Sequence, residues 1–235
     1  MPQSSDPQTP TEREKQAAAR ASLSYVESGD VVGLGTGSTA AYAVRFLGEQ
    51  VRRGLKIRGI ATSMNTKQLA TDAGIPLISL DECQQIDVTI DGADEVDPQL
   101  RLIKGGGGAL LREKIVASAS RKLVIIADSS KRVTHLGKFP LPVEVISFAE
   151  KLVAARISGL GASVALRRSA SGDPFTTDEG HHILDCSFGR IDDPSTLARR
   201  LSDMPGVVEH GLFIGMTSVA LIAEGERVLE LQGRP

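Results

Sequence analysis

The stretch that points most directly to the fold is Asp30-Val31-Val32-Gly33-Leu34-Gly35-Thr36-Gly37-Ser38-Thr39-Ala40. Its apolar start predicts a short strand over 30–34, and a helical pattern follows over 38–53. The glycines between them allow a tight turn, and free N–H groups at a helix start attract phosphate. Thr36, Ser38 and Thr39 add side-chain donors to this turn. We therefore expect an α/β unit whose turn binds an anion.

The alternation of strands and helices continues on both sides of this stretch. Further predicted elements up to residue 140 are a helix from the capping box Thr11-x-x-Glu14 to about Ser28, strand 57–61, helix 64–73, strand 86–90, a short strand near 99–103, helix 108–120 and strand 122–127. Strands that alternate with helices favour a mostly parallel, Rossmann-like sheet flanked by helices. The predicted fold class is therefore α/β.

The pattern changes near residue 140, where Phe139-Pro140-Leu141-Pro142 predicts a rigid connection. The elements that follow are helix 147–159, strand 162–167, a polar loop at 169–180, strand 182–187, helix 194–202, strand 206–210 and strands within 211–231 that return to the main sheet. This order favours a small α+β unit with an antiparallel sheet. The expected division is a mobile segment at 1–10, an α/β catalytic domain at 11–140 plus 211–235, and a second smaller α+β domain at 141–210, inserted before the last strands.

Two further segments carry the residue types of a catalytic site. The segment 86–97 predicts a strand that ends in a loop with four acids within seven residues. Lys104 is followed by four glycines and then by a helix that carries Glu113 near its start. Ordering such a glycine run costs more backbone entropy than ordering other residues. The run therefore indicates that a ligand approaches the main chain closely there, or that several backbone amides point at one spot. Because ligands bind at the carboxyl ends of strands in open α/β sheets, we expect the three segments to meet at a site that binds an anionic substrate and moves a proton.

Composition excludes several classes of protein. Of the 235 residues, 41% are apolar and 24% are charged, which is ordinary for a globular protein and excludes disorder along the whole chain. A net charge of -2 and an aromatic content of 3% argue against a nucleic-acid surface. The sequence shows neither a membrane-spanning run nor the pattern of a signal peptide, so we expect no membrane partner. Cys83 and Cys186 form no CxxC pair, which fits a reduced, cytoplasmic protein.

These motifs resemble those of ribose-5-phosphate isomerase, type A. The family's turn Gly-x-Gly-Thr-Gly-Ser-Thr, its loop Asp-Gly-Ala-Asp-Glu and its segment Lys-Gly-Gly-Gly…Arg-Glu-Lys stand here at 33–39, 91–95 and 104–114. Further matches are Ala127–Lys131, Leu136–Val145, Pro205–Val208 and Gly211–Phe213. The resemblance runs from about Lys15 to the C-terminus, and motifs in the family's order and spacing form a specific signal. Gly108 stands where the family often has alanine, a change that we expect to leave the pocket intact.

The resemblance implies an aldose–ketose isomerase that interconverts D-ribose 5-phosphate and D-ribulose 5-phosphate through an enediolate, in the non-oxidative branch of the pentose phosphate pathway. It implies no cofactor and no metal, and a homodimer or homotetramer. Glu113 is expected to shuttle the proton between C1 and C2, which requires a pKa raised towards working pH. Asp91 and Asp94 are expected to face the sugar hydroxyls; the resemblance associates Asp91 with ring opening and proton transfer at oxygen, and Asp94 with the lining of the same pocket. Lys104 is expected to hold one of them and to polarise the oxyanion.

The substrate-binding residues that the resemblance implies come from the same motifs and from two separate lysines. They are Thr36, Gly37, Ser38, Thr39, Asp91, Gly92, Ala93, Asp94, Lys104, Gly105, Gly106, Gly107, Lys131 and Lys15. We expect the phosphate at the turn 36–39 and the developing oxyanion at the amides of 105–107. We interpret Glu95 and Asp97 as structural or solvated, and the four histidines as neither catalytic nor metal-binding.

The residues alone leave other interpretations open. Glu113 would otherwise be a solvated glutamate on a helix surface, and Asp91 and Asp94 an acidic turn or an oxygen-ligand site for a divalent cation. A non-catalytic sugar-phosphate-sensing domain is the main alternative function, although sensing alone does not need Glu113. An acyl-CoA transferase would need a longer chain or a partner subunit. An amino-sugar phosphate deaminase is expected to bring a histidine near the acids, where the sequence has none.

Overall fold

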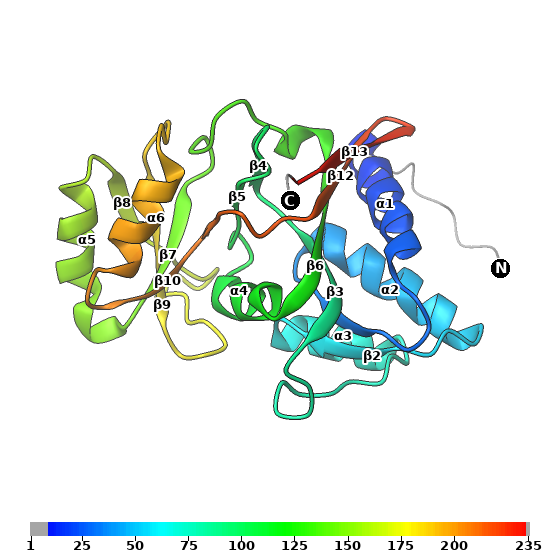
Figure 1. Ribbon diagram of the computed structural model, residues 1–235. Helices are drawn as coiled ribbons and strands as arrows, with labels where there is room; N and C mark the ends of the chain where they lie inside the picture. Colours follow the sequence, from blue (N-terminus) through cyan, green and yellow to red (C-terminus); the bar gives the residue numbers. More distant parts are fainter. Residues whose placement is uncertain (1–8, 234–235) are drawn as a thin grey trace.

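The computed structural model describes residues 9–233 and contains a six-stranded, a four-stranded and a three-stranded sheet (Figure 1). The six-stranded main sheet has the order β13-β12-β6-β3-β1-β2. Its strands are β1 (Val31–Leu34), β2 (Arg58–Ala61), β3 (Ile86–Gly92), β6 (Ser120–Asp128), β12 (Val219–Glu224) and β13 (Arg227–Gln232). All neighbouring strands pair in parallel except β12 and β13, which form an antiparallel hairpin. The predicted α/β class with a mostly parallel sheet is confirmed.

Helices cover both faces of the main sheet (Figure 1). One face carries α1 (Pro10–Ser22), α2 (Ser38–Arg52) and α3 (Met64–Asp72), and the other carries α4 (Leu110–Ser118). The alternating side chains of β6 show why both faces need cover. Val124 and Ile126 pack with the first group of helices, whereas Leu123 and Ile125 pack in the cluster on the opposite face. All four side chains are buried, as expected for a central strand of a parallel sheet.

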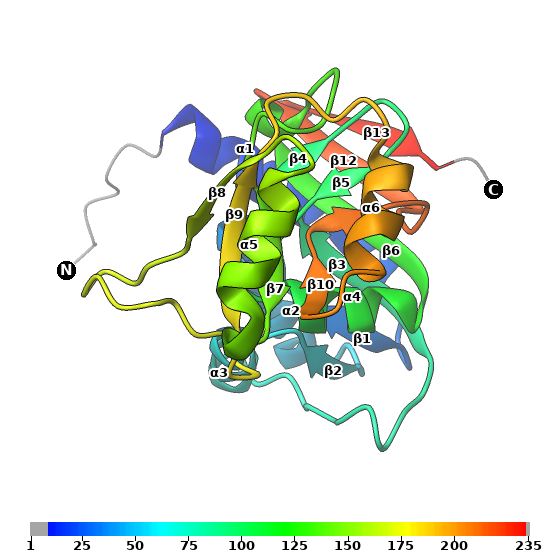
Figure 2. The same cartoon turned by 90° about the vertical axis from the view of Figure 1, so that its left-hand side faces the viewer.

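The second sheet is four-stranded and antiparallel, with the order β10-β7-β9-β8. Its strands are β7 (Leu141–Val145), β8 (Ser163–Leu166), β9 (His182–Ser187) and β10 (Val207–His210). The 3-10 turn η3 (Ser147–Ala149) leads into α5 (Glu150–Ser158), which covers one face together with α6 (Pro194–Ser202) (Figure 2). Helix α4 contacts β7 and β10 as well as β3 and β6 of the main sheet. The helix that carries Glu113 is therefore fixed between the two sheets.

The three-stranded sheet lies where the two larger sheets meet. It consists of β4 (Glu95–Val96), β5 (Leu102–Ile103) and β11 (Leu212–Phe213), in the order β11-β5-β4. Beside it, the Lys104 N–H donates to the Gly211 carbonyl (2.9 Å), and the Gly211 N–H donates to the Pro142 carbonyl (2.8 Å). A Cβ at Gly211 would lie 2.2 Å from the Lys104 carbonyl oxygen, so only glycine allows the backbone to pass this close to Lys104.

Strand β7 corrects one prediction. Pro142, which we interpreted as part of a rigid connection, lies inside this strand and pairs with Asp185 of β9. A strand residue directs its N–H and its C=O towards the same neighbour. The Pro142 carbonyl faces Gly211, which lies just beyond the last paired residue of β10. The N–H that proline lacks would point the same way, past the end of the β7–β10 pairing, so the sheet loses no hydrogen bond there. The prediction failed because proline in a central strand is a weak candidate from sequence alone.

The start of α1 also differs from the prediction. Thr9 is the N-cap and its Oγ1 accepts a hydrogen bond from the Glu12 N–H (3.2 Å), so the predicted capping box at Thr11 is wrong. The Glu14 carboxylate instead accepts hydrogen bonds from the Ser129 and Gly225 N–H groups (3.0 and 2.8 Å) and ties α1 to the main sheet. The helix ends at Ser22 and continues as the 3-10 turn η1 (Leu23–Tyr25). Of the segment 1–10 predicted to be mobile, 9 and 10 belong to this helix start, and 1–8 lie outside the described residues.

Two acids of the predicted acidic loop belong to the framework. Glu95 is buried and accepts hydrogen bonds from the Gly137 and Phe139 N–H groups (2.7 and 2.6 Å). Asp97 is buried too, and its carboxylate holds the turn before β5 through the Gln99 and Arg101 N–H groups. No helix in the described part of the chain is long and apolar enough to cross a bilayer.

Candidate active site

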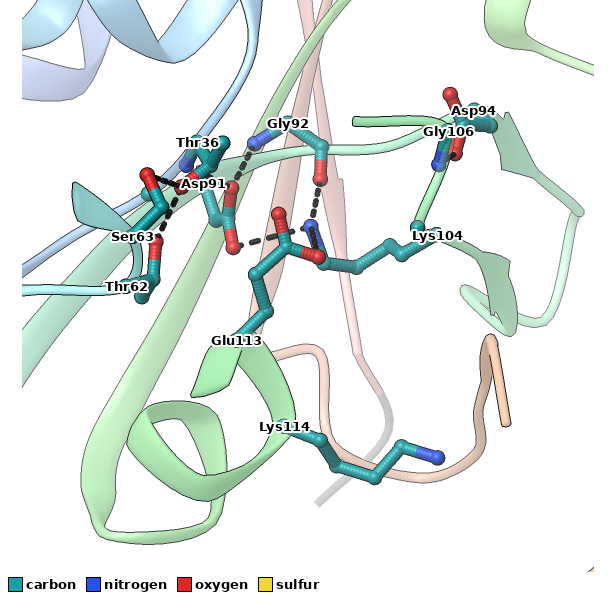
Figure 3. A network of polar contacts seen from close by, with 12 residues as sticks. Thr36, Thr62, Ser63, Asp91, Gly92, Asp94, Lys104, Gly106, Glu113 and Lys114 are labelled. Carbon is teal, nitrogen blue, oxygen red and sulfur yellow. Dashed lines mark hydrogen bonds and ion pairs between the residues drawn. The ribbon is translucent and has the colours of Figure 1, made fainter. Parts of the chain in front are cut away.

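The three motif segments meet at the carboxyl edge of the main sheet (Figure 3). The turn 35–37 follows β1, and Asp91 and Gly92 end β3. Lys104 directly follows β5, and Glu113 lies in the first turn of α4. Strand ends and a helix start from one hydrophobic framework therefore position all four groups, as expected for a ligand crevice in an α/β sheet.

Lys104 lies between two buried carboxylates. Its Nζ is 3.0 Å from Asp91 Oδ2 and 3.3 Å from Glu113 Oε2, and it donates a hydrogen bond to the Gly92 carbonyl (2.6 Å). The three residues are between 1% and 4% exposed. Burial lowers the pKa of Lys104, but the charges of Asp91 and Glu113 outweigh burial and raise that pKa above its ordinary value. One permanent cation thus faces two carboxylates, so the cluster has room for one additional proton.

The additional proton belongs on Glu113. Asp91 Oδ1 accepts hydrogen bonds from the Gly92 and Thr36 N–H groups (2.7 and 3.1 Å), whereas Glu113 Oε2 has no hydrogen-bond partner among the described residues. Burial raises the pKa of Glu113 to about 8; Lys104 opposes this shift and the charge of Asp91 adds to it. Burial raises the pKa of Asp91 as well, but Lys104 and the two amides favour its anion. A carboxylate that titrates near neutral pH can accept and return a proton.

The turn after β1 presents bare amides to the site. Gly37 is the N-cap of α2 with φ +107°, and no side chain of the described chain caps this helix. The N–H groups of the first helical turn are therefore free to bind an anion. Gly35 allows the turn to approach the acid, because a Cβ there would lie 2.2 Å from Asp91 Oδ1.

The Thr36 hydroxyl has a different role from the one we predicted. It donates to Ser63 Oγ (2.8 Å) and lies within hydrogen-bond distance of Thr62 Oγ1 (2.7 Å) and Thr66 Oγ1 (3.1 Å). These hydroxyls stand after β2 and at the start of α3. The Thr36 side chain is therefore not a free donor: it ties the turn to the neighbouring strand end, while Ser38 is exposed at the start of α2.

A polar cleft lies between these segments and collects most of the predicted site. It is lined by Thr36, Gly37, Ser38, Thr39, Gly92, Ala93, Asp94, Lys104, Gly105, Gly106, Gly107, Glu113 and Lys131. Two predicted residues are not in this lining. Asp91 lies beside Lys104 and is 1% exposed, and the Lys15 ammonium pairs with Glu12 Oε1 at 2.7 Å on its own helix.

A family model described as Ribose 5-phosphate isomerase A (phosphoriboisomerase A) matches residues 58–227. The chain belongs to this family. The ribose-5-phosphate isomerase A of Sinorhizobium fredii is 58% identical over 221 residues, which cover 90% of this chain and 95% of the relative. The solved ribose 5-phosphate isomerase A of Methanocaldococcus jannaschii has a TM-score of 0.90 at 41% identity, covering 94% of this chain and 99% of that one. A ribose-5-phosphate isomerase solved in complex with phospho-erythronic acid has a TM-score of 0.92 at 41% identity, with the same coverages. These names support an isomerase over a sensor domain.

The glycine run of this isomerase family is shaped by its neighbours. The Gly106 N–H donates to Asp94 Oδ2 (2.7 Å), so Asp94 is held by the backbone while Lys104 holds Asp91. A Cβ at Gly106 would lie 2.6 Å from Asp94 Oδ1. Gly108 has φ +80°, and a Cβ there would lie 2.5 Å from the Phe175 ring. Glycine in place of the family's frequent alanine therefore leaves room for Phe175.

Sequence reasoning missed residues that support the family motifs without belonging to them. Thr62, Ser63 and Thr66 bind the Thr36 hydroxyl, and their only sequence signal is their position after a predicted strand, at the same sheet edge. Arg167 donates to the Gly105 and Gly106 carbonyls, 62 and 61 positions earlier in the chain. No local pattern announces such a contact, because only the tertiary fold creates it.

The described residues offer no evident metal site. Within 9–233, no group of three or more His, Cys, Asp or Glu side chains is arranged to hold a metal ion. His181 and His182, adjacent on the chain, pair with separate carboxylates, those of Glu144 and Glu150.

Proposed function

We propose that this chain interconverts D-ribose 5-phosphate and D-ribulose 5-phosphate by moving a proton between C2 and C1. The observation that carries the proposal is the position of Glu113, buried at the cleft beside Lys104 with its pKa raised to about 8. A protein that only senses a sugar phosphate has no use for a buried carboxylate that titrates near neutral pH.

The proton transfer follows from this arrangement. In the direction from aldose to ketose, the Glu113 carboxylate removes the proton from C2, and the released electron pair forms the C1–C2 double bond. The C1=O electrons move onto O1, which gives an enediolate whose charge is stabilised by Lys104 and by amides of the glycine run. The proton of the O2 hydroxyl then passes to O1 as the C2=O bond forms, and Lys104 stays charged throughout. Glu113 returns its proton to C1, and the ketose results.

The two aspartates act at the sugar oxygens in different ways. Asp94 lines the cleft and Asp91 does not, so we assign the sugar hydroxyls and the proton transfer that opens the ring to Asp94 rather than to Asp91. Asp91 is 3.0 Å from the Lys104 ammonium and keeps it charged. This division explains why one acid is open to the cleft and the other is enclosed.

We assign the substrate phosphate to the start of α2. Ser38 and Thr39 line the cleft there beside uncapped backbone N–H groups, and Lys131 adds a positive charge to the same lining. A helix N-terminus with a nearby cation is a suitable cradle for a dianionic group. The assignment leaves Glu113 and Lys104 to the reacting carbons.

We infer that the chain forms a homodimer or homotetramer through a smaller domain at 141–210, set apart from 11–140 plus 211–235. Phe148 is fully exposed, and Ile146 and Leu152 beside it are 46% and 54% exposed. An apolar cluster of this kind is more often an interface than a free surface. Sedimentation of the wild type and Phe148→Glu tests this: we expect an oligomer and a smaller species respectively, and a monomeric wild type contradicts it.

We place the protein in the cytoplasm, in the non-oxidative branch of the pentose phosphate pathway. Cys83 and Cys186 are both free thiols, which is the usual state in a reducing compartment. Fluorescence microscopy of a tagged chain in intact cells tests the location, and a surface or exported signal contradicts it.

The decisive experiment incubates the purified chain with D-ribose 5-phosphate in the presence of EDTA and follows the appearance of D-ribulose 5-phosphate. We expect turnover without added cofactor, and the reverse reaction from the ketose. D-Ribose without phosphate is the matched control. It should react far more slowly because it lacks the phosphate that the start of α2 and Lys131 bind. Absence of turnover with both sugars contradicts the proposal.

A further inference from the structure

Two peptide groups of the glycine run have a fixed orientation. The Gly105 and Gly106 carbonyls both accept hydrogen bonds from Arg167 Nη1, at 2.8 and 3.1 Å. In a trans peptide the C=O and the following N–H point in opposite directions. No described peptide bond is cis. The N–H groups of Gly106 and Gly107 must therefore point away from Arg167.

The surroundings of these two N–H groups agree with this direction. The Gly106 N–H donates to Asp94 Oδ2 (2.7 Å), and Asp94 lines the cleft. The Gly107 N–H has no hydrogen-bond partner among the described residues, although Gly107 lines the same cleft. It is a preoriented donor without an acceptor, at the wall where a substrate oxygen would lie.

Arg167 is itself held rigidly. It follows β8, and its Nε and Nη2 bind the two carboxylate oxygens of Asp185 in β9 at 3.0 and 2.5 Å. Its guanidinium lies 5.9 Å from the centre of the Phe175 ring, and its side chain is only 13% exposed. The planar Arg167 guanidinium binds one carboxylate on one side and two carbonyls on the other, so it cannot rotate without breaking these hydrogen bonds.

We propose that Arg167 is a positioning residue of the isomerase reaction. It holds the Gly105–Gly106 and Gly106–Gly107 peptides so that one N–H fixes Asp94 and the other donates to the sugar oxygen that becomes negative in the enediolate. The Gly108 N–H also donates to the Gly105 carbonyl (3.0 Å), whereas the Gly106 carbonyl has Arg167 as its only partner among the described residues. Glycine peptides rotate with little steric resistance, so without Arg167 the Gly106–Gly107 peptide is the one that turns, and its N–H leaves the cleft. This inference rests on the proposed function and adds to it a residue from the second sheet.

The test compares Arg167→Met and Arg167→Lys with Arg168→Met. Arg168 is the matched control, because it is the neighbouring arginine and, among residues 9–233, its guanidinium binds only the exposed Gly172 carbonyl. We expect Arg167→Met to lower kcat about 10- to 100-fold, somewhat less than the direct removal of an oxyanion donor. KM should change less than about threefold, because Arg167 does not contact the phosphate end of the cleft. Arg167→Lys should fall between wild type and Arg167→Met, since an ammonium cannot hold both carbonyls and Asp185 in one plane.

A second readout separates positioning from general loss of structure. Phospho-erythronic acid carries a carboxylate where the enediolate carries its charge, whereas inorganic phosphate tests only the phosphate end. We expect calorimetric titration of Arg167→Met to show weaker binding of phospho-erythronic acid and unchanged binding of inorganic phosphate. If Arg167→Met does not fold, Asp185→Asn releases the same fork and should give the same pattern.

The possible outcomes separate the two proposals. Turnover by wild type and by Arg167→Met with kcat within threefold overturns the positioning role and leaves the isomerase intact. Equal losses for phospho-erythronic acid and inorganic phosphate overturn it too, because they indicate a general structural effect. A wild type without turnover overturns the proposed function, and the role of Arg167 with it.

Discussion

Glu113 Oε2 lies 3.3 Å from Lys104 Nζ without a hydrogen-bond partner among the described residues, while the same ammonium is 3.0 Å from Asp91. The cation therefore stabilises one anion more fully and leaves the other close to its point of titration. This imbalance provides both the charge that the reaction needs and the proton carrier.

Replacing Glu113 by glutamine should remove the proton carrier and preserve the shape of the cleft. We expect kcat to fall by about 10²- to 10⁴-fold with KM nearly unchanged, which is the usual contribution of a general acid–base group. Steady-state kinetics with D-ribose 5-phosphate measure both constants. Glu226→Gln, in the exposed turn between β12 and β13, is the control and should behave as wild type. A Glu113→Gln enzyme within tenfold of wild type would remove Glu113 from the mechanism.

The activity should depend on pH through the same group. Glu113 must be deprotonated to accept the C2 proton, and burial raises its pKa to about 8. We therefore expect kcat/KM to rise as pH increases and to level off above about 8, with an apparent pKa that belongs to the Asp91–Lys104–Glu113 cluster. A flat profile between pH 6 and 9 would show that the carboxylate is already ionised at pH 6.

Stability should change with pH in the opposite sense. The folded-state pKa of Glu113 lies above its unfolded value, so the folded protein binds more protons in the window between about 4.5 and about 8. The contribution of Glu113 to stability is therefore fully present below this window and is lost as pH rises through it. We expect the melting temperature of wild type, relative to Glu113→Gln, to fall as pH increases from 5 to 8.5. A difference that does not vary with pH would contradict the raised pKa.

Removing Lys104 should destabilise the fold as well as abolish turnover. Lys104→Met leaves two buried carboxylates without a cation, and loss of one partner of a buried ion pair costs about 3–5 kcal/mol. Denaturant unfolding at pH 8 measures this cost, which should shrink at pH 5 because protonation neutralises the remaining acids. Lys151→Met, at an exposed lysine of α5, is the control. Equal stability of the two variants at pH 8 would show that the acids do not depend on Lys104.

Lys131 should contribute to binding rather than to the chemical step. It lines the cleft, so Lys131→Met should raise KM about 10- to 100-fold, as expected for loss of a charged hydrogen bond, and leave kcat within about threefold. The salt dependence of KM should weaken with it. Lys138→Met, at an exposed lysine nearby, serves for comparison. A fall in kcat at unchanged KM would move Lys131 from the phosphate to the reacting carbons.

The sequence predicted the parts of this molecule that local chemistry determines. Strand 182–187 and helix 194–202 were placed to the residue, and the turn at 35–37 lies within the glycine-rich stretch 33–39. Boundaries shifted where tertiary pairing extends an element: β3 runs to Gly92 and β6 starts at Ser120, because each has a neighbouring strand to pair with there.

Contacts between distant segments were beyond local prediction. The strand around Pro142 is stable because β9 and Gly211 complete its hydrogen bonds. Whether Lys104 pairs with Asp91 or with Asp94 also depends on the direction of the Gly106 N–H, which binds the Asp94 carboxylate. Neither of these outcomes can be read from a window of adjacent residues.

The backbone contact between Gly211 and Lys104 has a consequence for how the protein matures. Lys104 is anchored through its backbone N–H to the Gly211 carbonyl, and its ammonium lies 5.4 Å from the centre of the Phe213 ring. During synthesis on the ribosome, the nascent chain therefore contains every acid of the cluster long before it can hold the lysine that compensates them. Activity should therefore appear only after residues 211–213 have left the exit tunnel.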